Sequence, residues 1–191
     1  TSVNLSACVA AEGKRVLVVD ADPQGNTSSG LGVRVKEKTP TVYEVMAGET
    51  PIEQALCKTA VKGLMVLPAD IRLAGAEIEL ANMERRERVI ADMLEGVREQ
   101  FDYIFIDCPP VEIVADAAII NKLADMTLFI VRAGLLDRSM LPDIEKFYND
   151  KKYKNMSLIL NGTDGGSGRY GYKYGYKYGY HYGYVGYTKE E

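Results

Sequence analysis

Five short runs of β-branched and other apolar residues recur along the chain, separated by stretches with helical spacing. The runs are residues 15–20 (RVLVVD), 64–70 (LMVLPAD), 101–107 (FDYIFID), 127–133 (TLFIVRA) and 156–162 (MSLILNG). Continuous apolar runs of this length are typical of strands buried on both faces. Because strands alternate with helices, the pattern predicts a largely parallel, doubly wound sheet with helices on both faces, so the fold class is α/β.

Helical spacing or helix-start signals mark the segments between these runs. The expected helices cover residues 3–11, 41–48, 52–59, 73–99 with a break near Asn82, 114–123 and 139–152. Residues 20–32 (DADPQGNTSSGLG) are rich in Gly, Ser and Asn and indicate a loop. We therefore expect one domain over residues 1–162.

The last part of the chain follows a different pattern. Beyond Gly162 no apolar residues return at core spacing, so residues 163–191 are expected to form a flexible, disordered tail. The tail carries nine of the chain's thirteen tyrosines: Tyr170, Tyr172, Tyr174, Tyr176, Tyr178, Tyr180, Tyr182, Tyr184 and Tyr187. Their period of two suits an adhesive, β-prone segment, whereas the regular glycines suit an extended phosphorylation substrate.

Charge is distributed unevenly between the tail and the body. Arg169, Lys173 and Lys177 contribute +3, so the rest of a chain with net charge −4 carries −7. An acidic body gives no electrostatic reason to expect strong nucleic-acid binding.

Composition narrows the class of protein further. The chain is 47% hydrophobic and 26% charged, as a soluble globular protein is, and no run of about 18 apolar residues is present. The first residues lack the basic start and apolar middle of a signal peptide, so we expect a cytoplasmic protein. Cys8, Cys57 and Cys108 form no CxxC pair, which argues against a disulfide framework or a zinc site.

Three acidic residues are candidates for chemistry. Asp20 and Asp107 each end a predicted buried strand, and Asp22 follows in the loop. Ligands of α/β sheets bind at the carboxyl ends of the strands, where a fixed carboxylate can hold magnesium or orient a nucleophile. Capping of the following loop is the alternative role for a single aspartate at such a position, and two equivalent strand ends weaken it.

The first 110 residues closely resemble chromosome- and plasmid-partitioning ATPases of the ParA type. The resemblance lies in LSACVAAEGKRVLVVDADPQGNTSSGLGV, TVYEVM, LMVLPADIRLAGAEIEL and FDYIFIDCPP. It implies a P-loop NTPase fold with a deviant Walker A motif that uses ATP and Mg²⁺. By the same resemblance Asp22 would help to position the attacking water, Asp107 would be the Walker B acid that serves magnesium, and Asp20 would support that metal site.

Residues 111–162, followed by the tyrosine tail, resemble instead the bacterial tyrosine kinases (BY-kinases) of capsule and exopolysaccharide production. In that family such a tail is the autophosphorylation site, which implies modification of Tyr170 through Tyr187. The implied partners are like subunits or an intact tyrosine kinase acting in trans, and a membrane activator protein that would hold the protein at the inner face of the membrane. The sequence therefore resembles a chimera of two related ATPase families.

Both families place a strand and a glycine-rich loop ending in Gly-Lys-Thr or Gly-Lys-Ser before the helix that opens this chain. Neither is found in the 191 residues, so we expect weak or no binding of ATP and Mg²⁺ by this chain. In related ATPases an amide near the position of Asn161 contacts the nucleotide base, and a turn-forming Asn-Gly is the alternative.

Three functions stay open at this point. The first is a truncated ATPase domain, inactive alone, with a tyrosine-rich phosphorylation tail. The second is a ParA-type partitioning ATPase with an exchanged C-terminus, for which DNA is the expected partner. The third is a chimeric fragment with no activity.

Overall fold

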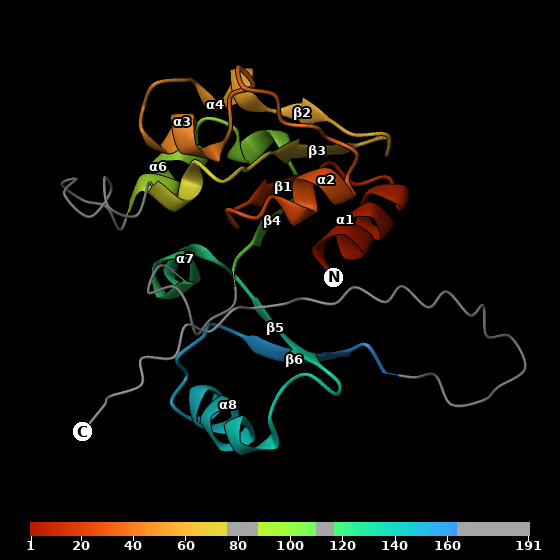
Figure 1. Cartoon of the computed structure of the whole chain (residues 1–191), viewed down its shortest axis with the longest axis vertical. Helices are drawn as coiled ribbons and strands as arrows, with labels where there is room; N and C mark the ends of the chain where they lie inside the picture. Colours follow the sequence, from red (N-terminus) through yellow and green to blue (C-terminus); the bar gives the residue numbers. More distant parts are fainter. Residues whose placement is uncertain (76–87, 110–116, 164–191) are drawn as a thin grey trace, which may run out of the picture.

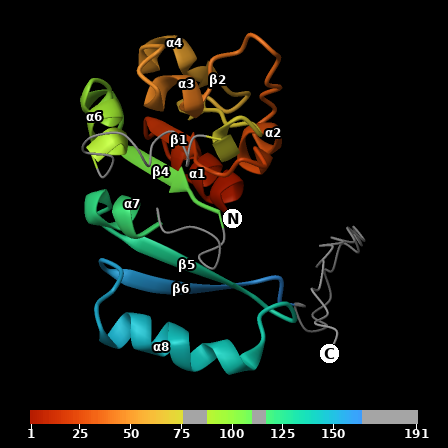
Figure 2. The same cartoon turned by 60° about the vertical axis from the view of Figure 1, so that its left-hand side comes forward.

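A computed structural model describes residues 1–75, 88–109 and 117–163 (Figures 1 and 2). Its helices are α1 (Ser2–Ala11), α2 (Asn26–Gly30), α3 (Val42–Met46), α4 (Ile52–Ala55), α6 (Val89–Glu95), α7 (Ala117–Leu123) and α8 (Leu141–Asn149). The strands are β1 (Val16–Asp20), β2 (Cys57–Lys58), β3 (Leu64–Leu67), β4 (Tyr103–Asp107), β5 (Thr127–Arg132) and β6 (Met156–Asn161). Short 3₁₀ helices, η2 (Arg98–Gln100) and η3 (Arg138–Met140), precede β4 and α8.

Strand β1 is the centre of a four-stranded sheet with the order β2-β3-β1-β4. It runs parallel to β3 on one side and to β4 on the other, and only β2 is antiparallel. All five β1 residues are buried, as the β-branched run predicts for a strand covered on both faces. The parallel register aligns the carboxyl ends of β1 and β4.

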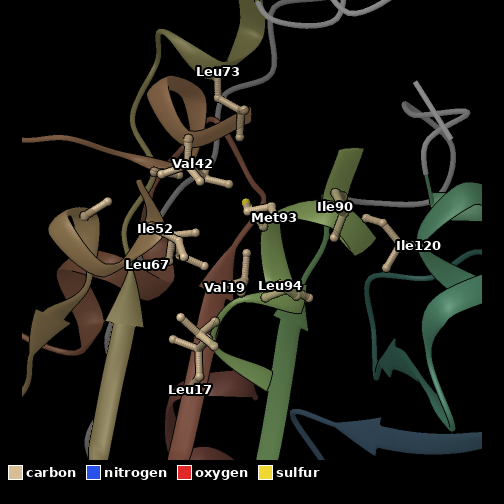
Figure 3. Close-up of a cluster of buried hydrophobic side chains, with 14 residues drawn as sticks. Leu17, Val19, Val42, Ile52, Leu67, Leu73, Ile90, Met93, Leu94 and Ile120 are labelled. Atoms are coloured by element: carbon tan, nitrogen blue, oxygen red, sulfur yellow. The ribbon is translucent and has the colours of Figure 1, made fainter. Parts of the chain in front are cut away.

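Helices cover both faces of this sheet, so the doubly wound α/β architecture expected from the sequence is confirmed. On one face, Leu17 and Val19 of β1 pack with α3, α4 and α6, as Figure 3 shows, and Ile120 of α7 joins the same cluster. On the other face, Val16 and Val18 pack with α1 through Ala10. Alternate residues of one strand therefore contribute to two separate cores.

A second sheet holds the parallel pair β5–β6. Helix α8 lies on the side of this pair away from the first sheet in both Figure 1 and Figure 2. It packs there through Ile144, with Tyr153 and Met156, in a third core. The rings of Phe129, Phe147 and Tyr153 meet in this core at centroid separations of 5.6 to 6.4 Å.

The five predicted strands are all present, with ends within two or three residues of the expected ones. Two elements differ from the expectation. Residues 52–59 are not one helix, because the chain leaves α4 at Leu56 and forms the short strand β2. Residues 20–32 are not loop throughout, because Asn26–Gly30 form α2.

The expected sheet is divided. Within the described part of the chain β4 pairs only with β1, and β5 pairs only with β6. Parts of the helices expected over residues 73–99 and 114–123, and nearly all of the tail, lie outside the described residues. No helix among the described residues is long and apolar enough to cross a membrane. The assignment of residues 1–162 to one domain stays a prediction.

Candidate functional site

Asp20 and Asp107 lie side by side at the carboxyl end of the first sheet. They are register partners at the ends of the parallel strands β1 and β4. The backbone N–H of Ala21 donates to the carbonyl of Asp107 at 2.8 Å, which continues the pairing one residue beyond the strand. Two carboxylates therefore meet on one edge, as their positions after two buried runs predict.

Two hydroxyls hold the Asp107 carboxylate. Ser2, in the first turn of α1, donates to Oδ1 at 2.6 Å, and Thr27 of α2 donates to Oδ2 at 2.6 Å. Both carboxylate oxygens are therefore engaged, and the side chain has a fixed orientation. A hydroxyl that donates its proton still has lone pairs that can accept a hydrogen bond, so the Ser2 and Thr27 oxygens remain available as acceptors beside Asp107.

The Asp20 carboxylate is fully buried and is held mainly by Ser28. The backbone N–H and the hydroxyl of Ser28 donate to Oδ2 at 2.8 and 2.6 Å, and the backbone N–H of Asp22 donates to Oδ1 at 3.3 Å. Burial raises the pKa of Asp20, the bonds from Ser28 and Asp22 oppose that rise, and the nearby Asp107 adds to it. Oδ1 is therefore held less tightly than Oδ2.

Asp22 lies in the turn that leads from β1 to α2. Its Oδ1 accepts a hydrogen bond from the backbone N–H of Gln24 at 2.9 Å, and its carbonyl accepts one from Gly25 at 2.9 Å. The side chain is half-buried. Asp22 is therefore next to the two strand-end carboxylates but on a turn that local hydrogen bonds shape.

Asn161 ends β6, and it meets the beginning of the chain. Its Nδ2 donates to the hydroxyl oxygen of Thr1 at 3.3 Å, and its own Oδ1 accepts from the backbone N–H of Gly162 at 2.8 Å. Since Ser2 contacts Asp107, the start of α1 lies near the carboxyl ends of both sheets, and Figures 1 and 2 both show the N-terminus between them. The predicted tail tyrosines Tyr170 to Tyr187 lie outside the described residues.

Sequence reasoning missed three residues of this site: Ser2, Thr27 and Ser28. Thr27 and Ser28 are neighbours in the stretch NTSSG, and each donates to a different carboxylate. Thr27 and Asp107 are 80 residues apart in the chain, so local patterns gave no sign of the contact. Three consecutive hydroxyl residues after an acidic loop were the available signal.

The carboxylate ligands at this edge suit a magnesium ion that keeps much of its water better than a metal ion held by protein side chains alone. Among the described residues no group of three or more His, Cys, Asp or Glu side chains is placed to hold a metal ion. Magnesium commonly takes one or two carboxylates and completes its six oxygen ligands with water and phosphate. Asp20 and Asp107 fit that use.

Cys108 follows the second carboxylate directly. Burial raises the pKa of its thiol to about 12, and the negative charges of Asp107 and Asp22 add to the shift. A thiol with this pKa is protonated at neutral pH and is a poor nucleophile. Cys108 therefore contributes packing rather than chemistry to this edge.

Comparison with known proteins agrees with the architecture. Residues 1–157 match the family model AAA_31, described as "AAA domain". The chain is 47% identical over 112 residues to the chromosome partitioning protein ParA of Caulobacter vibrioides, a match that covers 58% of this chain and 42% of that protein. The chain thus spans less than half the length of this curated relative.

Two solved structures at 30% identity have the same fold. Cobyrinic acid a,c-diamide synthase from Mycobacterium smegmatis, solved with a bound ATP analog and magnesium, superposes with a TM-score of 0.67 over 81% of this chain and 64% of that one. The BceF tyrosine kinase domain superposes with a TM-score of 0.66 over 84% of this chain and 62% of that one. The chain belongs to the AAA-domain family AAA_31 and has a P-loop NTPase-like α/β fold.

Proposed function

We propose that residues 1–162 carry the metal- and water-handling part of a ParA-like ATPase site. The observation that supports this function is the adjacency of Asp20 and Asp107 at the ends of two parallel strands, with Asp22 in the next turn. Magnesium would supply charge neutralisation for the phosphates when bound. Asp20 and Asp107 would hold its water shell, and Asp22 would orient the attacking water.

The contribution of these residues is positioning rather than covalent chemistry. Ser2 and Thr27 fix the orientation of Asp107, and Ser28 fixes one oxygen of Asp20. Fixed acceptors reduce the reorganisation needed when a hydrated cation and a triphosphate arrive. The 191 residues contain no Gly-Lys-Thr or Gly-Lys-Ser sequence to cradle phosphates, so nucleotide binding by this chain alone is expected to be weak or absent.

The nucleotide part of the proposal is tested by adding a phosphate cradle. The chain is compared with a version extended at its N-terminus by the strand and glycine-rich loop of a ParA relative, and Mg²⁺-dependent binding of a fluorescent ATP analogue is measured. The extended chain should bind the analogue, and Asp107→Asn in that chain should lose the binding. Asp125→Asn is the control, because Asp125 is an exposed acid in the turn before β5, and it should keep the binding. If the folded extended chain does not bind, or if Asp107→Asn binds as tightly as the parent, the proposal is wrong.

The tail is the second part of the proposed function: a substrate for tyrosine phosphorylation by an intact kinase of the BY type. The likeness to the BceF tyrosine kinase domain and the glycine-spaced tyrosines support it. Each phosphate adds about −1.5 to −2 charges at neutral pH, so four phosphates would shift the tyrosine segment 169–187, which carries +3, by roughly −6 to −8. A change of this size would repel the acidic body or a neighbouring copy.

Phosphopeptide mass spectrometry after coexpression with such a kinase tests this part. The chain provides its own control, because Tyr103 and Tyr148 are 49% and 63% exposed on the body. We expect phosphate on Tyr170 to Tyr187 and little on the two body tyrosines. An unmodified tail, or equal labelling of body and tail, would contradict a dedicated substrate tail.

A partitioning ATPase with an exchanged C-terminus is the second candidate, and the 47% identity to ParA favours it. This candidate requires DNA binding that weakens as salt rises. Retention on a DNA column at low salt, lost at high salt, would support it. Absence of retention, of nucleotide binding by the extended chain and of tail phosphorylation would leave a chimeric fragment without activity.

A further inference from the structure

The hydroxyl of Ser28 connects two buried groups, one at the end of β1 and one in the turn that follows β3. It donates to Oδ2 of Asp20 at 2.6 Å and accepts a hydrogen bond from the backbone N–H of Ala69 at 3.0 Å. Asp20, Ser28 and Ala69 are all at most 2% exposed. Because the Ala69 N–H can only donate, the single proton of the hydroxyl must point to the carboxylate, so the direction of this bridge is fixed.

Ala69 begins a turn that continues to the surface. Oδ1 of Asp70 accepts hydrogen bonds from the backbone N–H and from Nε of Arg72, both at 3.0 Å. The same guanidinium forms an ion pair with Glu44 and donates to the carbonyl of Thr39 at 3.2 Å. The turn is therefore attached at its inner end to the carboxylate site and at its outer end to α3 and the segment before it.

Nearby contacts keep this turn close to α2. A side chain at Gly25 would place its Cβ 2.7 Å from the carbonyl oxygen of Ala69, so the two backbones approach more closely than a side chain allows. The backbone N–H of Val42 donates to the carbonyl of Pro68 at 2.8 Å. A movement of Ser28 would thus be passed to residues 68–72 rather than absorbed by empty space.

We infer that Ser28 is a positioning residue that holds Asp20 and the Ala69–Arg72 turn as one unit, so that a cation held at Asp20 changes the turn. The cation part of this inference rests on the proposed function. The hydroxyl bridge itself does not. The turn carries Ile71, a large apolar side chain that is 68% exposed. A change in the turn on cation binding would therefore alter an apolar part of the protein surface.

The test compares substitutions on one short helix. Ser28→Ala removes both the donor to Asp20 and the acceptor for Ala69, and Ser28→Thr keeps a hydroxyl at the position. Ser29→Ala is the matched control, because the Ser29 hydroxyl donates only to the carbonyls of Gly25 and Asn26. Ser28→Cys provides a second variant of similar size and weak hydrogen-bonding ability in case the alanine variant does not fold.

Amide hydrogen exchange, read by NMR in the presence and absence of Mg²⁺ alone, is the measurement. In Ser28→Ala and Ser28→Cys, protection of the Ala69 amide should fall by about tenfold or more, because a buried N–H loses its acceptor. Ser28→Thr should restore it and Ser29→Ala should leave it unchanged. Mg²⁺ should alter exchange at Ala69 and Arg72 in the parent and lose that effect in Ser28→Ala.

Unchanged Ala69 protection in Ser28→Ala would overturn the bridge, as would an equal loss in Ser29→Ala. If Mg²⁺ shifts the carboxyl ¹³C signals of Asp20 and Asp107 but not the Ala69 amide, the coupling to the turn is wrong. If Mg²⁺ shifts neither carboxyl signal, the proposed metal site fails and the coupling fails with it, while the exchange data without metal still decide the bridge.

Discussion

Replacing Gly25 by alanine should destabilise the protein more than the same change at Gly32, because only Gly25 lies against another backbone. Both glycines have positive φ, +60° and +79°. A left-handed conformation costs an L-residue about 1–2 kcal/mol, so both substitutions share that loss. Both also share the gain from a less flexible unfolded chain, about 0.4–1 kcal/mol, which cancels in the comparison.

The two sites differ in the space around the added methyl group. At Gly25 the new Cβ would lie 2.7 Å from the carbonyl oxygen of Ala69 and 3.5 Å from its carbonyl carbon, whereas at Gly32 no atom lies within 4 Å. Backbone atoms cannot rotate away as a side chain can, so α2 or the end of β3 must shift. Forced overpacking of this kind costs about 1–3 kcal/mol. The free energy of unfolding should therefore fall by about that much more in Gly25→Ala than in Gly32→Ala.

Urea denaturation followed by far-ultraviolet circular dichroism measures the difference. The chain has no tryptophan and most of its tyrosines lie in the tail, so fluorescence would report poorly on the folded body. Equal losses in the two variants, with equal dependence on urea concentration, would refute the close approach between Gly25 and Ala69. A larger loss in Gly32→Ala would refute the reasoning altogether.

Three further predictions concern ionisable groups. Because burial raises the pKa of Asp20, folding disfavours the ionised form of this side chain. Asp20→Asn, which carries no charge, should therefore raise the melting temperature at pH 7 in a thermal scan, and a lower melting temperature would contradict this. Hydrogen bonds from Arg15 lower the pKa of Asp102 to about 2, so its stabilising effect should be lost as pH falls from about 4 to about 2. A carboxyl ¹³C titration should show that low pKa in the parent and a higher pKa in Arg15→Gln, which stays below the ordinary value because the backbone N–H at position 15 keeps its bond to Oδ2. Identical titrations would disprove the side-chain pairing. At pH 8 a maleimide should modify the exposed Cys8 well before Cys108, because burial raises the pKa of the Cys108 thiol to about 12. Peptide mass spectrometry measures the two rates, and equal rates would show that Cys108 is not buried as described.

The strands and the paired carboxylates were predictable because each depends on a local pattern plus one general rule. A β-branched run such as residues 16–20 marks a buried strand, and the rule that parallel strands end on one edge brings Asp20 and Asp107 together. The hydroxyls that hold the carboxylates were not predictable. The contacts from Thr27 and Ser2 to Asp107 span 80 and 105 residues, and only the folded chain determines which serine or threonine arrives there.

Local patterns also failed where a short element depends on its neighbour. Strand β2 has two residues and exists because Cys57 and Lys58 pair with β3, so its own sequence carries no strand signal. The division of the sheet between β4 and β5 was equally hidden, since both strands have ordinary apolar runs. Strand pairing is a relation between segments, and a single segment does not specify it.

Helix α7 joins two separately packed bodies through two neighbouring residues. Ile120 belongs to the core beneath the first sheet, while Asn121 donates to the carbonyl of Lys152 at 2.8 Å and accepts from the backbone N–H of Lys154 at 2.7 Å. The core around α8 shares no member with the two cores of the first sheet among the described residues. In evolutionary terms, a crossover between β4 and α7 would leave the core on the α1 face and the core around α8 each within one segment of the chain. Among the described residues it would divide only the core on the α6 face, where Ile120 is the buried side chain that would come from the other segment.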